Sequence, residues 1–172
     1  MLKFATITSV KINPTEKAEV IHAKCITVQS EWQQPASEIW DRVKQMATLQ
    51  YIAYPVFTFL PITPITPHSV WQPNTTVTVK VKLFGLLPMG LHTITLTEID
   101  NRHFQLLTNE YSNIFTLWKH HIAVKTLTNN TCRYTDTLTI YAKWLTPLAA
   151  WVVKRFFIHR HNRWVKLLNL GN

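Results

Sequence analysis

Glycine and cysteine are both scarce in this sequence. Only 3 of its 172 residues are Gly, so a glycine-rich backbone loop that cradles phosphate groups is not expected. The two cysteines, Cys25 and Cys132, lie in segments with strand-like patterns and show neither Cys-X-X-Cys nor Cys/His spacing. A disulfide scaffold and a zinc site are therefore not predicted, and both cysteines are expected to be buried free thiols.

Long hydrophobic runs are also missing. The nearest one extends from Leu145 to Ile158, but Lys154 and Arg155 interrupt it, and a membrane-spanning helix needs about 20 apolar residues. The segment from Met1 to Val10 lacks a signal-peptide pattern. We therefore expect a cytoplasmic protein, and no motif predicts a bound metal or cofactor.

Acidic residues are few compared with basic ones. The chain has 18 Lys and Arg against 9 Asp and Glu, which gives a formal charge of +9. Such an excess fits nucleic acid, an anionic membrane, or simply a basic solvated surface. Because the usual nucleic-acid-binding motifs are absent, nucleic acid is not predicted as a partner.

A long amphipathic helix is the clearest feature that is present, over residues 144–168. Thr146 and Pro147 predict its start, with the Thr hydroxyl as a cap and Pro where no amide hydrogen is needed. Arg160 interrupts one wide apolar face, which otherwise contains Ala149, Ala150, Val153, Phe156, Phe157, Trp164, Leu167 and Leu168. A basic face and a second apolar stripe (Trp151, Ile158, Val165) could contact the N-terminal segment, a partner subunit or a membrane.

The rest of the chain predicts an α+β protein with an antiparallel sheet. Residues 20–30 show a strand pattern, Gln34-Pro35 opens a helix, and residues 49–54 form a short helix or turn. After a proline-rich loop at 61–73, residues 75–142 alternate in polarity and are broken by turn signals at 85–90, 100–101 and 129–130. We predict a curved sheet of about six to seven strands wrapped around the C-terminal helix, with residues 1–20 as a less certain N-terminal extension.

This order resembles the helix-grip fold of the START-like (SRPBCC) superfamily, which includes Bet v 1-type proteins and polyketide cyclases. The similarity covers about residues 20–168 and is carried by three passages: QPASEIW (34–40) with LQYIAYP (49–55), WKHH (118–121) with TCRYTD (131–136), and WLTPL (144–148) with FIHRHNRW (157–164). The resemblance implies one START-like domain over residues 1–172. It implies a cavity between sheet and helix, but no catalytic residue set.

Apolar residues on the inward faces of these elements are the candidate ligand-binding wall. A hydrophobic small molecule or lipid would contact Val79, Val81, Phe104, Trp118, Tyr134, Phe156 and Phe157. The alternative is that these side chains simply fill the core.

Three polar residues lie in otherwise apolar rows: His120, Asp136 and Arg160. Arg160 could anchor a carboxylate or enolate, with His120 or Asp136 as a proton donor or acceptor. It could instead form an ion pair with Asp136 or extend to the helix edge. If Asn129-Asn130 is a regular two-residue turn, His120 and Asp136 face opposite sides of the sheet, and a bulge would bring them to one side.

We therefore expect a non-enzymatic carrier of a hydrophobic small molecule or lipid. Two alternatives remain: a cyclase/aromatase-type enzyme, and a peripheral membrane or interaction protein using the basic helix. A homodimer is also left open. The histidine pairs at 120–121 and 159–161 do not predict a metal site, because neither pair shares a face.

Overall fold

The computed structural model describes residues 1–13, 20–62 and 71–169 as one α+β unit. Eight strands form a single antiparallel sheet in the order β1-β2-β8-β7-β6-β5-β4-β3. The elements are β1 (Leu2–Ile12), β2 (Ile21–Trp32), α1 (Ala36–Val43), α2 (Met46–Ala53), β3 (Phe57–Pro61), β4 (Thr76–Leu83), β5 (Leu87–Asp100), β6 (Gln105–Ser112), β7 (Leu117–Thr128), β8 (Thr131–Tyr141) and α3 (Thr146–Asn169).

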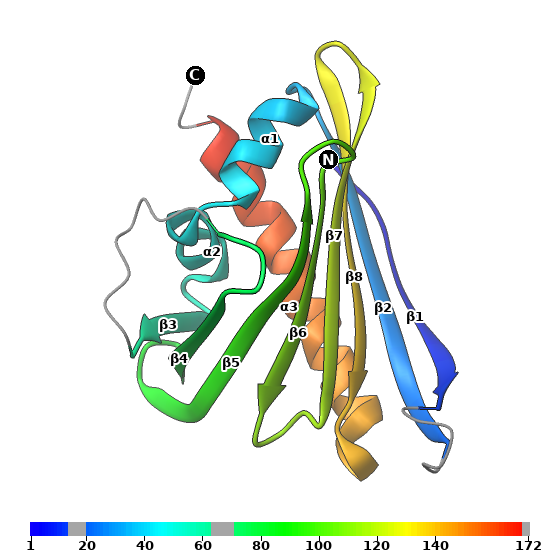
Figure 1. Cartoon of the computed structure of the whole chain (residues 1–172), viewed down its shortest axis with the longest axis vertical. Coiled ribbons are helices and arrows are strands. Elements are labelled where there is room, and N and C mark those ends of the chain that lie inside the picture. Colours follow the sequence, from blue (N-terminus) through cyan, green and yellow to red (C-terminus); the bar gives the residue numbers. More distant parts are fainter. Residues whose placement is uncertain (14–19, 63–70, 170–172) are drawn as a thin grey trace.

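The sheet curves around α3, which runs along its concave side, and α2 packs against the C-terminal half of that helix (Figure 1). Helix α3 and the sheet face each other with their apolar sides. These sides carry the residues predicted from the 3.6-residue period of the helix and the two-residue period of the strands. Ile26, Leu138, Ile140, Ala150 and Phe157 are buried where the helix crosses β2 and β8. The predicted α+β architecture with a curved antiparallel sheet and a C-terminal helix is confirmed.

The number of strands was wrong, because the sheet has eight strands and not six to seven. The N-terminal residues 2–12 form β1, which pairs with β2 along most of its length. As an edge strand β1 is nowhere fully buried, so its alternation of polarity is weak. Residues 57–61 form the other edge strand, β3, where Pro61 is tolerated because one side needs no partner.

The turn expected over residues 85–90 is shorter, and β5 already begins at Leu87. Phe84 and Gly85 both have positive φ angles, 51° and 71°, which reverse the chain tightly. Gly90 has a φ angle of 94° at a register shift between β4 and β5. Glycine adopts this conformation without strain, so Gly90 marks a bulge inside the strand and not the end of a loop.

The start of α3 also differs in detail from the expected cap. The Thr146 hydroxyl accepts a hydrogen bond from the Ala142 backbone N–H at 2.9 Å and donates one to the Lys143 carbonyl at 2.6 Å. It therefore joins the helix to the turn before it. Within the described ranges no helix is long and apolar enough to cross a membrane, and the cytoplasmic location stays a prediction. Most of the proline-rich loop lies outside the described residues.

Candidate functional site

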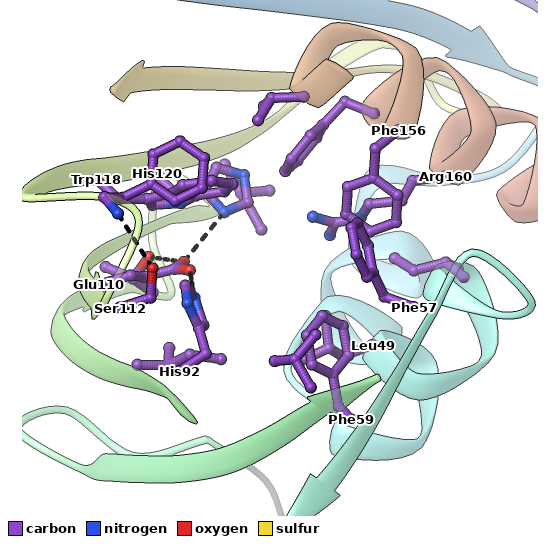
Figure 2. Close-up of a pocket in the computed structure, with 18 of the residues that line it drawn as sticks. Leu49, Phe57, Phe59, His92, Glu110, Ser112, Trp118, His120, Phe156 and Arg160 are labelled. Carbon is purple, nitrogen blue, oxygen red and sulfur yellow. Dashed lines mark hydrogen bonds and ion pairs between the residues drawn. The ribbon is translucent and has the colours of Figure 1, made fainter. Parts of the chain in front are cut away.

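A cavity of about 440 Å³ lies between α3, α2 and the inner face of β4–β7. Its size falls in the range of small-molecule sites. The lining is mostly apolar and aromatic, with Leu49, Phe57, Trp118 and Phe156 on different sides (Figure 2). Leu148 and Val152 line it and are still 60% and 43% exposed, so the cavity opens to solvent at the start of α3.

Most of the residues predicted for the ligand-binding wall lie at this cavity. The lining includes Val81, Trp118, His120, Tyr134, Phe156, Phe157 and Arg160. Among the described residues, Val79, Phe104 and Asp136 do not belong to the lining. Val79 packs into a core cluster with Met46 and Val77, and Phe104 stacks on Trp40 at a centroid distance of 5.8 Å. Phe104 lies in a turn with a φ angle of 54° and not in the expected strand, which explains its direction.

Asp136 is the centre of a buried hydrogen-bond network. Its carboxylate lies 2.7 Å from His120 Nε2, 3.0 Å from His161 Nε2 and 3.1 Å from the Tyr134 hydroxyl. An ionised carboxylate only accepts, so all three partners donate to it. The network joins β7, β8 and α3 behind the cavity wall.

The charges around Asp136 hold its pKa below the ordinary value. Burial alone would raise that pKa, but the positive charge of Arg160 and the hydrogen bonds from His120 and His161 outweigh burial. Burial and the neighbouring Asp136 raise the pKa of the Tyr134 hydroxyl well above its usual range. Asp136 is therefore ionised and Tyr134 is neutral in the folded protein.

His161 extends this network to a third strand. Its Nδ1 lies 2.7 Å from the hydroxyl of Ser30 on β2, while its Nε2 contacts Asp136. The imidazole is almost completely buried and packs against the rings of Trp32 and Tyr134. One side chain of α3 thus connects the helix to both β2 and β8.

A second carboxylate, Glu110 on β6, lies at the cavity itself. His92 Nε2 is 2.5 Å away, the Thr108 hydroxyl donates to it at 2.7 Å, and His120 Nδ1 is 3.8 Å away. His92 and His120 approach Glu110 from two sides in Figure 2. Burial opposes ionisation, but the interactions with His120 and His92 outweigh burial and lower the pKa of Glu110.

His120 therefore lies between two carboxylates. Burial by itself lowers its pKa, but the hydrogen bond with Asp136 and the nearby carboxylate of Glu110 outweigh burial and raise it. The protonated imidazolium can donate from both ring nitrogens. Nε2 is hydrogen-bonded to Asp136 at 2.7 Å, whereas Nδ1 faces Glu110 at 3.8 Å, which is an ion-pair distance and not a hydrogen bond.

A β-bulge brings His120 and Asp136 to the same side of the sheet. The turn at Asn129-Asn130 pairs Thr128 with Thr131, but the register shifts between Thr126 and Thr128. His120 then lies opposite Leu138, so His120 and Asp136 share the inner face.

Arg160 does not form the ion pair with Asp136 that was considered as an alternative. Among the described residues no carboxylate lies within ion-pair distance of its guanidinium, although the side chain is only 5% exposed. The guanidinium instead lies over the Phe157 ring, 4.3 Å from the centroid. It also does not extend to the helix edge, but points into the cavity (Figure 2).

Comparison with known proteins places the chain in a family. A family model described as "Domain of unknown function (DUF8410)" matches residues 30–168, which is most of the chain. The chain belongs to the DUF8410 family. No curated protein matches its sequence.

Solved structures show the fold that this DUF8410 member shares. A START superfamily protein from Mycobacterium smegmatis superposes with a TM-score of 0.66 at 12% identity, over 86% of this chain and 99% of that one. An aromatase/cyclase from a Streptomyces species superposes with a TM-score of 0.59 at 14% identity, over 83% of this chain and 91% of that one. Norcoclaurine synthase from Thalictrum flavum superposes with a TM-score of 0.53 at 14% identity, over 82% of this chain and 96% of that one. The resemblance to the START-like superfamily is confirmed at the level of fold.

Four polar residues at or next to this cavity were not predicted from the sequence: Ser30, His92, Glu110 and His161. The sequence pattern that identified His120, a polar residue in an otherwise apolar row, could also have identified them. Glu110 follows Leu106 and Thr108 at two-residue steps, and His92 precedes Ile94 and Leu96 in the same way. His161 lies four residues after Phe157 and three before Trp164, on the apolar face of α3.

Proposed function

We propose that this protein binds a hydrophobic small molecule in the cavity between α3 and the sheet. The observation that carries the proposal is the lining: a space of about 440 Å³ is walled mainly by aliphatic and aromatic side chains and has an opening at one end. An apolar ligand in such a space loses its contact with water, which favours binding. The solved relatives in fold, which include a synthase and an aromatase/cyclase, are consistent with a ligand site there.

A carrier or binding role fits the polar groups better than a cyclase role does. Asp136 lies outside the cavity lining, and His120 has both ring nitrogens directed at carboxylates. A general acid or base must reach the reacting atom and have a proton or lone pair to exchange. We therefore propose that this pair stabilises the fold, and that ligand binding survives its replacement where the fold does.

Two measurements test the binding proposal. Native mass spectrometry of the protein purified from its own host should show a retained apolar compound. In vitro, the neutral dye N-phenyl-1-naphthylamine should bind, with an increase in fluorescence. The Ala149→Trp variant, which places a large ring at the cavity wall, should lose this signal.

Asn162→Trp is the matched control, because Asn162 is an exposed residue of the same helix that does not line the cavity. It should bind the dye as the wild type does. Equal binding by wild type and Ala149→Trp, or no bound compound and no dye binding at all, would contradict the proposal.

Membrane contact is a second candidate function, favoured by the surface around the cavity opening. Trp144 and Trp151 are 84% and 54% exposed there, beside Leu148 and Val152. Lys143 and Lys154 are close to these residues in the sequence, and the Arg155 guanidinium lies 5.5 Å from the Trp151 ring centroid. Exposed aromatic and basic groups together favour the surface of an anionic bilayer. We propose that this opening can face a membrane from which a lipid-like ligand is taken.

A further inference from the structure

Arg160 is a buried cation whose hydrogen-bonding capacity is unused. Its guanidinium has five N–H donors, and its Nε is buried without a partner. No hydrogen bond or ion pair to Arg160 comes from any part of the chain that the structure describes. Burying such a group without an acceptor is costly, so an acceptor inside the cavity would stabilise it.

The aromatic rings of α3 hold this guanidinium at the cavity wall. It lies 4.3 Å from the Phe157 centroid and 5.9 Å from the Phe156 centroid. These contacts favour the cation and restrict its position, but they satisfy none of its N–H groups. Figure 2 shows the guanidinium directed from the helix side into the space between Phe156 and Phe57. An acceptor that reaches it must therefore enter through the cavity.

The two carboxylates nearby already have partners of their own. Asp136 accepts from His120, His161 and Tyr134 and lies behind the lining. Glu110 is held by His92 and Thr108 on the sheet side of the cavity, across from Arg160 (Figure 2). Neither is free to turn toward Arg160 without breaking a buried network. The cavity thus has one fixed cationic point at its helix side and an apolar interior next to it.

We propose that the ligand is an amphiphilic organic acid whose carboxylate is bound by Arg160 and whose apolar body fills the cavity. This inference rests on the proposed binding function and adds the chemical class of the ligand. A planar guanidinium matches a carboxylate through two parallel hydrogen bonds. A neutral apolar ligand of the same shape would leave the buried donors unpaired.

The test compares carboxylates with neutral molecules of matched shape. Dodecanoate is paired with dodecanol, and 2-naphthoate with 2-naphthamide, and their dissociation constants are measured by calorimetry at neutral pH. Wild-type protein should bind each carboxylate about 10- to 100-fold more tightly than its neutral partner. In Arg160→Met this ratio should fall to about one, with the affinity for dodecanol retained or increased.

Lys166→Met is the matched control, because Lys166 is an exposed cation on the same helix outside the lining and far from the cavity opening. It should keep the wild-type ratio. If Arg160→Met does not fold, the NMR signal of the Arg160 Nε–H in the wild-type protein is measured instead. The chemical shift of this signal should change on addition of dodecanoate and stay unchanged on addition of dodecanol. Equal affinity for acids and neutral partners would overturn the inference and leave the binding function intact. Binding of none of the four probes would overturn both.

Discussion

Asp136 shows how one buried side chain can hold several elements of this fold together. It accepts hydrogen bonds from β7, from its own strand β8 and from α3, and His161 continues the contact to β2. A buried charge stabilises a fold only where partners satisfy it. Here every partner is itself buried, so loss of the charge leaves several polar groups without an acceptor.

We expect Asp136→Asn to lower the free energy of unfolding by about 3 kcal/mol, because the amide NH₂ meets donors where the carboxylate accepted. Urea denaturation at pH 7 measures the difference. Asp41→Asn is the control: Asp41 is exposed on α1, and within the described part of the chain it pairs only with Lys44, so its change should stay within about 0.5 kcal/mol. A similar small effect at Asp136 would show that the network contributes little.

His120 should make stability depend on pH on the alkaline side. Its pKa is raised in the folded state, so its contribution is fully present below its unfolded pKa of about 6.5 and disappears as the pH rises through the folded value. The free energy of unfolding of the wild type, relative to His120→Gln, should therefore fall as the pH rises above about 6.5. Parallel curves for the two proteins over this range would rule out the effect.

At the scale of elements, the start of α3 depends on the Thr146 hydroxyl. That hydroxyl is buried and bonded to both the Ala142 N–H and the Lys143 carbonyl. Valine has nearly the same shape but no hydroxyl, so Thr146→Val leaves a buried backbone N–H without its partner. We expect a loss of about 1–2 kcal/mol in the free energy of unfolding.

Thr126→Val provides the reference for that measurement. Thr126 is exposed near the end of β7, and valine suits a strand, so this change should alter stability by less than about 0.5 kcal/mol. Equal effects at positions 126 and 146 would mean that the hydroxyl of Thr146 is not needed to position the helix.

Elements with a strong period could be predicted from the sequence, and those at sheet edges could not. The stripe of Val153, Phe157, Trp164 and Leu168 predicted α3 to within a few residues, since all four side chains are buried along one face of the helix. β1 was missed as a firm strand because an edge strand buries little on either face. The bulge near Leu127 decides which side of the sheet His120 faces. It cannot be recognised from the alternation of polar and apolar residues, because residues 125–130 are all exposed.

The site was predictable only in part for a related reason. A polar residue in an apolar row indicates burial, and this identified His120, Asp136 and Arg160. Which of these residues meet depends on register, on side-chain direction and on the crossing of α3, none of which follows from one strand alone. Opposite charges favour an ion pair between Arg160 and Asp136. The Asp136 carboxylate instead accepts hydrogen bonds from His120, His161 and Tyr134.

At the scale of the whole molecule, the charge of +9 should matter for membrane contact. Vesicles of equal parts phosphatidylglycerol and phosphatidylcholine should bind the protein at low salt. Binding should fall at least about 10-fold between about 0.05 and about 0.5 M NaCl, because surface charges are screened. Sedimentation of vesicles measures the bound fraction.

Two charge reversals on α3 show which end faces the bilayer. Arg155→Glu, next to the cavity opening, should weaken binding, whereas Lys166→Glu should change it less because Lys166 lies about 16 Å further along the helix. Equal effects would indicate non-specific attraction to the whole basic surface and contradict docking through the opening.

The buried hydrogen-bond network around Asp136 and the cavity wall are largely built from different residues. Ser30, Asp136 and His161 connect the helix to the sheet without lining the cavity. Side chains such as Ile94, Met89 and Val152 line the cavity without belonging to the network. Apart from His120 and Tyr134, which belong to both sets, the residues that hold the fold together and those that contact a ligand are therefore at separate positions. Divergence or directed evolution can reshape the wall around a new compound while the scaffold remains intact, which makes this architecture well suited to acquiring new specificities.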